Sequence, residues 1–422
     1  MDRRKQQISL IALVGWGMLG ACDIEDPQEC QGSARQIVET DEVLEGVVDG
    51  NTGFALELYR ELVEEDENFF FSPFSISLAL GMSELGADGT TAEEMREVLG
   101  IPADESPWHA AIGGLGSDIG SELHCDYELA LANRLFSQMG YPIQQSYLDA
   151  AMEYYEAPVE QMDFAGDTEG SREHINAWVS EITRDKISEA LPPGLLTPQT
   201  VMVLVNAIYF KGDWMQPFDE ASTNEQGIFV QEDGTELTTP IMWGEMEEAR
   251  YAEVENAQIL ELPYKGDELS MIIALPNPGV LLSDLEAELS AADITSWNAA
   301  LQPTPVFVSL PKFEMRSAAT LNTALEALGM EKAFIPGEAD FGRKVDPGSS
   351  VYISSVIHEA YVKVDEKGTE AAAVTVVVDE PTSAPAYPYF QATRPFLFQI
   401  QDQLTGSVLF MGRVVDPTEK AD

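Results

Sequence analysis

The chain has 422 residues, of which 45% are hydrophobic and 23% charged, and its formal net charge at pH 7 is −50. This is the composition of a globular protein with enough apolar residues for a large core, in one large domain or two ordinary ones. Only 23 basic residues are scattered along it, whereas phosphate binding needs clustered lysines and arginines, so we expect no nucleic-acid partner.

The N-terminus has the features of an export signal. Positive charge in residues 2–5 precedes an apolar run, residues 8–19, that is shorter than the roughly 20 residues of a membrane-spanning helix. The run leads to Leu-Gly-Ala-Cys at Cys22, which resembles a bacterial lipobox, whose cysteine is lipidated and becomes the mature N-terminus. We predict a signal peptide at 1–21 and a lipid anchor with an acidic tether at 22–46.

The expected location follows from this signal. We expect an exported bacterial lipoprotein, anchored at the cell envelope or cell surface, or else a secreted, extracellular protein. Contact with a membrane is expected through the N-terminal lipid only, and an anchor of more than one acyl chain is stable. A plain secretory signal, with Cys22 unmodified, is the alternative.

The remaining cysteines are Cys30 and Cys125. An exported protein permits a disulfide between them, but the sequence gives no sign that they lie close together, so their pairing stays open. The four histidines are dispersed and no Cys-x-x-Cys motif occurs, so we expect no metal site and no cofactor.

Helical patterns dominate the first part of the chain. Residues 51–65 carry apolar residues at helical spacing, and an apolar helix is predicted at 75–87. Another helix is predicted to begin at Thr90, with Thr91 and Glu94 placed as a capping box.

The order of elements predicts an α+β fold. An amphipathic helix is expected at 171–191, capped by Ser171. Strand patterns with one helix follow at 201–214, 259–275, 306–310, 321–328 (the helix), 351–366, 396–400 and 407–415. Helices first and strands late lack the regular alternation of a parallel α/β fold, and no linker or repeat divides the chain, so we expect one domain, 47–419.

The sequence contains neither of two motifs that are typical of hydrolytic enzymes. There is no Gly-x-Ser-x-Gly elbow and no Gly-x-x-x-x-Gly-Lys-Ser/Thr phosphate loop. We therefore expect a protein that is not an enzyme.

Several separated stretches, taken together, resemble the serpin family. They are FFSPFSI at 70–76, HINAWV at 174–179 with 183–187, LVNAIYFKGDW at 204–214, LPKF at 310–313, His358 with 364–373, RPF at 394–396 and LFMGRV at 409–414. The match covers residues 47–418 in the family's order. The resemblance implies a monomeric single domain with three β-sheets, about nine helices and an exposed reactive loop. It also implies a single-use inhibitor of serine proteases, in which the cleaved loop inserts into the sheet and traps the acyl-enzyme in a covalent complex.

The stretch at 366–383, EKGTEAAAVTVVVDEPTS, has the features that such insertion requires. Side chains alternate faces along a strand, and the face that begins at Thr369 continues with small or apolar residues as far as Val377. In the family this face turns inward. Asp379 is the exception, because a buried unpaired carboxylate is costly.

The beginning of this stretch resembles the hinge of inhibitory members. Gly368 permits the backbone rotation of a hinge, Thr369 carries no charge, and alanines have no side-chain entropy to lose. The predicted hinge residues are Glu366, Lys367, Gly368, Thr369, Glu370, Ala371, Ala372 and Ala373.

Family members are cut 17 residues along, with the hinge glutamate counted as the first. Counting from Glu366 predicts the reactive bond Thr382–Ser383, with Ser383–Ala384 as the near alternative. A threonine fits a small pocket, so elastase-like or subtilisin-like proteases are the expected targets. Asp379–Glu380 would suit an acid-specific protease but leaves too short a loop.

The resemblance also carries over two groups of polar residues. Ser72, Ser75, Asn206, Ser354 and His358 match the cluster under the point where the sheet opens. Trp214, Lys312 and Glu366 match the region where insertion begins, and an ion pair of Lys312 with Glu366 would hold the loop base. No lysine or arginine occurs at 113–124, so no heparin-type cofactor is expected. The alternative reading is a non-inhibitory binding or storage member that is cleaved without trapping.

Overall fold

The computed structural model describes residues 42–64, 66–120, 126–346, 351–369 and 387–420, all of which fall in one compact unit, Gly32–Asp422. Two short 3-10 helices lie at Glu220–Ser222 and Lys332–Phe334. The nine α-helices of the described residues are α1 Glu42–Leu62, α2 Pro73–Glu84, α3 Gly89–Leu99, α4 Glu105–Ile119, α5 Gln145–Tyr155, α6 Thr168–Ile182, α7 Leu282–Glu288, α8 Ala291–Ala300 and α9 Asn322–Ala327.

The strands of the described residues form three sheets. The six-stranded sheet contains, in spatial order, β12 Phe313–Thr320, β13 Ser355–Asp365, β14 Gly368–Thr369, β4 Met202–Asp213, β2 Tyr127–Gln138 and β3 Val159–Met162. The seven-stranded sheet contains β1 Phe69–Phe71, β17 Val408–Val414, β16 Phe396–Asp402, β9 Leu269–Pro276, β8 Ala257–Pro263, β7 Arg250–Glu253 and β10 Gln302–Pro303. The four-stranded sheet contains β15 Tyr389–Gln391, β11 Val306–Pro311, β6 Glu236–Met246 and β5 Asn224–Val230. The expected α+β fold with three sheets and about nine helices is confirmed.

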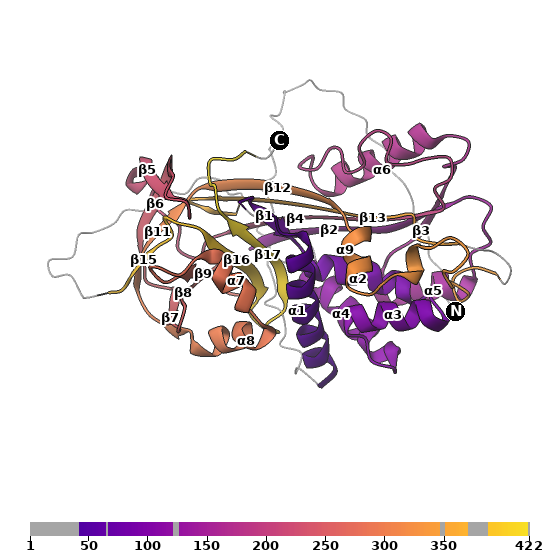
Figure 1. Ribbon diagram of the computed structural model, residues 1–422, viewed down its shortest axis with the longest axis horizontal. Helices are drawn as coiled ribbons and strands as arrows, with labels where there is room; N and C mark the ends of the chain where they lie inside the picture. The colour runs from indigo at the N-terminus through magenta and orange to yellow at the C-terminus, as the bar shows by residue number, and fades with distance from the viewer. Residues whose placement is uncertain (1–41, 65, 121–125, 347–350, 370–386, 421–422) are drawn as a thin grey trace, which may run out of the picture. The chain divides into compact units, whose positions relative to one another are not determined.

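The six-stranded sheet is covered on both faces (Figure 1). Helix α6 lies on one face, where Ile175 and Val179 pack with Val203 and Val205 of β4. Helix α2 and the main core lie under the other face, where the alternate residues of β4 point. Because β4 is central and covered on both sides, its sequence is a nearly continuous apolar run rather than an alternating one.

Two expected helix starts are wrong. Helix α6 begins at Thr168, and its cap is Asp167, whose carboxylate accepts a hydrogen bond from the Gly170 amide; the Ser171 hydroxyl donates to the Asp167 carbonyl from inside the first turn. The helix ends at Ile182 rather than 191, because Arg184 and Asp185 take left-handed backbone angles.

The capping box at Thr91 and Glu94 is also wrong. Helix α3 begins at Gly89 and is capped by Asp88. Thr91 instead accepts a hydrogen bond from the Asp340 amide, and Glu94 accepts bonds from the amides of residues 331 and 332. Both side chains therefore join α3 to a distant part of the chain, which a local motif cannot reveal.

Candidate functional site

The site lies where β4 and β13 of the six-stranded sheet separate. The two strands pair in parallel from Val203 with Ser355 to Tyr209 with Tyr361. Beyond that point β14 lies between them, antiparallel to both: Thr369 is opposite Gly212 on β4 and Val364 on β13. The chain that leads to residue 370 therefore enters the sheet at its opening.

The two residues of β14 fit a narrow space. Gly368 has a φ of 153°, and a Cβ there would lie 2.1 Å from the Gly212 carbonyl oxygen, so only glycine is accommodated. Thr369 is fully buried, and its Oγ1 lies 2.8 Å from the hydroxyl of Tyr264. The Tyr264 ring stacks on Trp214, with centroids 4.6 Å apart. Burial raises the pKa of Tyr264, so the hydroxyl stays neutral.

The residues before β14 are held by an ion pair and by backbone bonds. Lys312 Nζ lies 2.6 Å from Glu366 Oε1, which also accepts a 2.6 Å hydrogen bond from the Thr223 hydroxyl. Burial acts to raise the pKa of Glu366, but the bonds from Lys312 and Thr223 outweigh it and the pKa is lowered. Trp214 Nε1 donates to the Asp365 carbonyl at 3.0 Å. The structure thus brings together the three residues expected at this end, while their role stays a prediction.

Further along the sheet lies a buried polar cluster. The Ser72 amide donates to His358 Nε2 at 3.1 Å, and His358 Nδ1 pairs with Asn206 Oδ1. The Asn206 amide group donates to the carbonyl of Ser75 at 3.0 Å and also contacts the Ser75 hydroxyl. Burial lowers the pKa of His358 to about 3, so the imidazole is neutral, with its proton on Nδ1. Four of the five expected cluster residues are brought together.

The structure changes the membership of this cluster. Ser354 lies just before β13, and its hydroxyl accepts a 3.0 Å bond from the Val201 amide rather than bonding to the imidazole. Asn133 of β2, which sequence reasoning missed, contacts Asn206 directly. Asn133, Asn206 and His358 are opposite one another on β2, β4 and β13 and form a polar row across the sheet. The signal for Asn133 was a lone amide in the apolar stretch LALANRLF.

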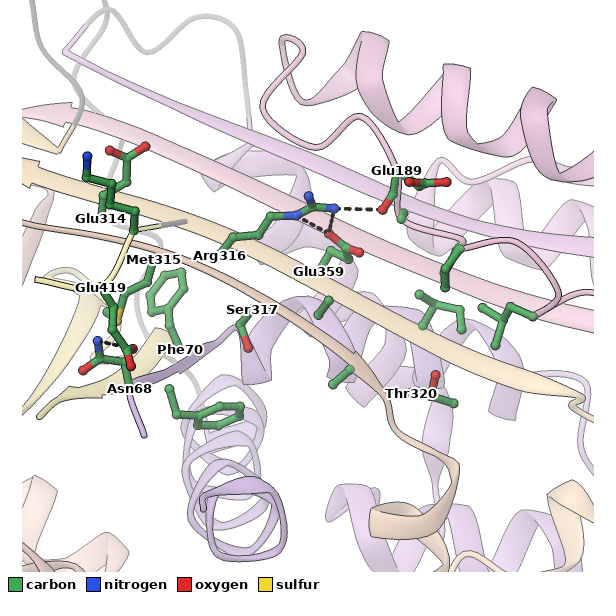
Figure 2. Close-up of a pocket in the computed structure, with 18 residues that line it drawn as sticks. Asn68, Phe70, Glu189, Glu314, Met315, Arg316, Ser317, Thr320, Glu359 and Glu419 are labelled. Atoms are coloured by element: carbon green, nitrogen blue, oxygen red, sulfur yellow. Dashed lines mark hydrogen bonds and ion pairs between the residues drawn. The ribbon is translucent and has the colours of Figure 1, made fainter. Parts of the chain in front are cut away.

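The outer edge of the same sheet carries a groove of about 530 Å³ beside β12 (Figure 2). In it Arg316 Nε and Nη2 donate to Glu359 Oε2 at 3.0 and 2.9 Å, and Nη2 also donates to the carbonyl of Glu189 at 2.8 Å. Burial raises the pKa of Glu359, and Arg316 opposes this rise. Because Glu189 belongs to the connection after α6, this contact fixes that connection to the edge of the sheet.

Several predicted residues lie outside the described residues. They are the signal peptide, Cys22, Cys30, Cys125, Glu370, Ala371, Ala372, Ala373, Asp379, Thr382 and Ser383. Across the part of the chain that is described, no helix combines the length and apolar character needed to cross a bilayer, and no group of three or more His, Cys, Asp or Glu side chains could hold a metal ion.

The fold and the site define a class of protein. It is a single α+β domain whose six-stranded sheet holds a two-residue strand, β14, between two long strands, β13 and β4. The family model described as "Serpin (serine protease inhibitor)" matches residues 49–417. The chain belongs to the serpin family, a family of protease inhibitors and not of enzymes.

Individual relatives agree with this assignment. Human serpin B8 is 38% identical over 379 residues, which cover 89% of this chain and 100% of the relative. Leukocyte elastase inhibitor of Xenopus tropicalis is 37% identical, over 89% of this chain and 100% of the relative. The crystal structure of human thyroxine-binding globulin with thyroxine matches with a TM-score of 0.80 and 30% identity, over 89% of this chain and 100% of that one.

Proposed function

We propose that the protein is a single-use inhibitor of serine proteases that prefer small residues. The observation that carries this proposal is the position of β14. Gly368 and Thr369 occupy the opening of the sheet and are antiparallel to both neighbours, as the first residues of an inserting strand must be. The alternative is a binding or storage protein that is cleaved without trapping.

The register of β14 supports continued insertion. If the strand continued beyond Thr369, every second residue would face inward. These residues are the small or apolar ones from Thr369 to Val377. Thr375 would then lie between Asn206 and His358, where a hydroxyl can replace the bond that these two side chains now make with each other. Insertion would exchange the parallel ladder between β4 and β13 for two antiparallel ladders, which are slightly more stable per residue.

The covalent step is ordinary acyl transfer. The protease serine Oγ attacks the carbonyl carbon of Thr382, an ester forms, and the amide bond to Ser383 breaks. The amine of Ser383 takes the proton and becomes the new N-terminus of the C-terminal part of the chain. Insertion of the freed loop would carry the ester-linked protease along the sheet before water hydrolyses the ester.

The target class follows from the residue at the bond. The threonine side chain is small and uncharged, which suits the shallow pocket of elastase-like and subtilisin-like enzymes. Between Lys367 and Arg394 there is no lysine or arginine, so trypsin-like enzymes are disfavoured. A relative named leukocyte elastase inhibitor is consistent with this preference.

The test uses the purified protein with an elastase-type and a subtilisin-type protease. We expect a complex that survives SDS and boiling, with loss of protease activity. Thr369→Arg places a long charged side chain where the native residue is fully buried, so we expect cleavage of that variant without a complex. Thr369→Ser, which keeps the hydroxyl for Tyr264, is the matched control and should still trap. Cleavage of the wild-type protein beside an active protease would overturn the proposal and favour the alternative.

We further propose that Cys22 carries the lipid anchor. The support is the lipobox-like sequence at the end of the apolar run. Metabolic labelling with a fatty-acid analogue should mark the wild-type protein and not Cys22→Ser. Equal labelling of both, or of neither, would contradict the anchor and leave a plain secretory signal.

A further inference from the structure

A lysine is buried beneath the far end of the same sheet. Lys344 is 2% exposed and lies between the rings of Phe341 and Tyr147, with Nζ 4.3 and 5.1 Å from their centroids. Its Nζ donates a 3.1 Å hydrogen bond to the hydroxyl of Ser83 and lies 3.5 Å from the sulfur of Met202, which is on β4. The ammonium group therefore lies against the inward face of β4.

This ammonium has no ion-pair partner among the described residues: none of their carboxylates lies within 4.0 Å of Nζ. Glu84 interacts with Lys344 electrostatically and acts to raise its pKa. The Glu84 carboxylate is bonded, however, to Arg96 at 2.7 Å and to His109 at 3.0 Å. Burial lowers the pKa of Lys344 to about 7. A buried, unpaired cation is costly, so its presence requires an explanation.

The surrounding residues accommodate the lysine closely. Gly86 faces its stem, and an added Cβ there would lie 2.6 Å from both Cβ and Cε of Lys344. The Lys344 carbonyl accepts a 2.9 Å bond from the Gln144 amide, which fixes the backbone. The side chain is thus held with its charge toward Met202.

The register of β14 brings one carboxylate to this place. If the antiparallel pairing of Thr369 with Gly212 and Val364 continues, Asp379 would fall opposite Met202 on β4 and Ser354, the residue before β13. Asp379 is ten residues beyond Thr369, an even number, so in a continued strand its side chain would point to the same inward face. Side chains directly opposite one another on adjacent strands are about 4.5–5.5 Å apart at Cβ, so the carboxylate of Asp379 would adjoin the Met202 side chain that Lys344 contacts.

We propose that Lys344 is the receptor for Asp379 of the inserted reactive loop, with the buried ion pair forming only after cleavage. This inference rests on the proposed function, because it requires the loop to insert. The native state then contains a lone buried cation, and the inserted state contains a paired one. Asp379, which departs from the apolar face of the loop, becomes the residue that completes insertion at its far end. Pairing of the buried Lys344 cation and the new contact of Asp379 would both favour insertion.

The experiment compares native protein with protein nicked between residues 380 and 386, the nick being located by mass spectrometry. Guanidinium chloride midpoints are measured for both forms of the wild type, Lys344→Met, Asp379→Asn and the double variant. Glu380→Gln is the matched control, since it removes the same charge from a neighbour that faces the other side of the strand.

We expect Asp379→Asn to leave the native midpoint unchanged and to lower the midpoint of the nicked form by roughly 0.5 M. Lys344→Met should raise the native midpoint and lower the nicked one, and the double variant should recover part of that loss. Glu380→Gln should change neither form.

The outcomes separate the two proposals. If nicking does not raise the wild-type midpoint, the loop does not insert and the proposed function fails. If nicking raises it but the two substitutions are additive, the Lys344 receptor is wrong while insertion stands. Coupling already present in the native form would also overturn the receptor, because the pair would then precede cleavage.

Discussion

The paired strands β4 and β13 have an opening end, where β14 lies between them, and a far end near Met202. The two ends differ in how their charges are compensated. At the opening end, Glu366 is paired with Lys312, and Thr369 of β14 is hydrogen-bonded to Tyr264. At the far end, Lys344 lies buried, and no carboxylate of the described residues is within 4.0 Å of its Nζ. On the proposed function, the opening end already has the contacts of an inserting strand, whereas the far end would gain its ion pair only on insertion.

The largest expected effect comes from removing the lone cation. Lys344 has a folded-state pKa of about 7 against 10.5 in the unfolded chain, so between these values the unfolded state binds more protons and native stability rises with pH. Lys344→Met should remove this rise. We expect its stabilisation relative to wild type to be roughly 2–4 kcal/mol larger near pH 6 than near pH 10, measured by chemical unfolding. A constant difference across this range would mean that the lysine is solvated.

The second effect concerns the opening end. Lys312→Glu would place two carboxylates together at Glu366 and release the base of β14. We expect a loss of about 1–3 kcal/mol of unfolding free energy and the appearance of polymers, followed by thermal melting and size-exclusion chromatography. Unchanged melting with a monomeric profile would show that the pair does not hold the opening.

The third effect lies between these two ends, in the polar row. Asn133→Ala removes one contact of Asn206, while the Asn206 bond to the Ser75 carbonyl remains. We expect a loss of about 1 kcal/mol, measured by chemical unfolding. A loss several times larger would indicate that Asn133 organises the whole cluster.

The smallest expected effect is that of Lys367→Gln, which is the control for Lys312→Glu. Lys367 pairs with Glu220 at 3.2 Å, but Glu220 is largely exposed. We expect Lys367→Gln to change stability by less than about 0.5 kcal/mol, and less still at high salt. A change comparable to that of Lys312→Glu would show that any positive charge near the hinge has the same role.

The sequence allowed the fold and much of the opening end to be predicted, because family motifs fix the order of elements and place Glu366, Lys312 and Trp214. Local signals failed where side chains serve distant contacts. Thr91 and Glu94 resemble a cap, yet Thr91 bonds to the Asp340 amide and Glu94 to the amides of residues 331 and 332. Ser171 follows the true cap, Asp167.

The far end could not be predicted for a related reason. Lys344 lies in the stretch FGRKVD, which reads as a solvated loop, and nothing local reveals that Gly86, Tyr147 and Met202 enclose it. Asp379 could therefore be read only as an exception to the apolar face. The structure adds the register of β14, which relates each later position of the loop to a position on β4 and β13.

The central claim, that cleavage leads to a trapped acyl-enzyme, is tested most directly by intact mass spectrometry of the protein mixed with an elastase-type protease. Under denaturing conditions we expect a covalent species whose mass equals the protease plus the chain ending at Thr382, and the fragment beginning at Ser383 as a separate mass. Only nicked inhibitor beside free, active protease would contradict it.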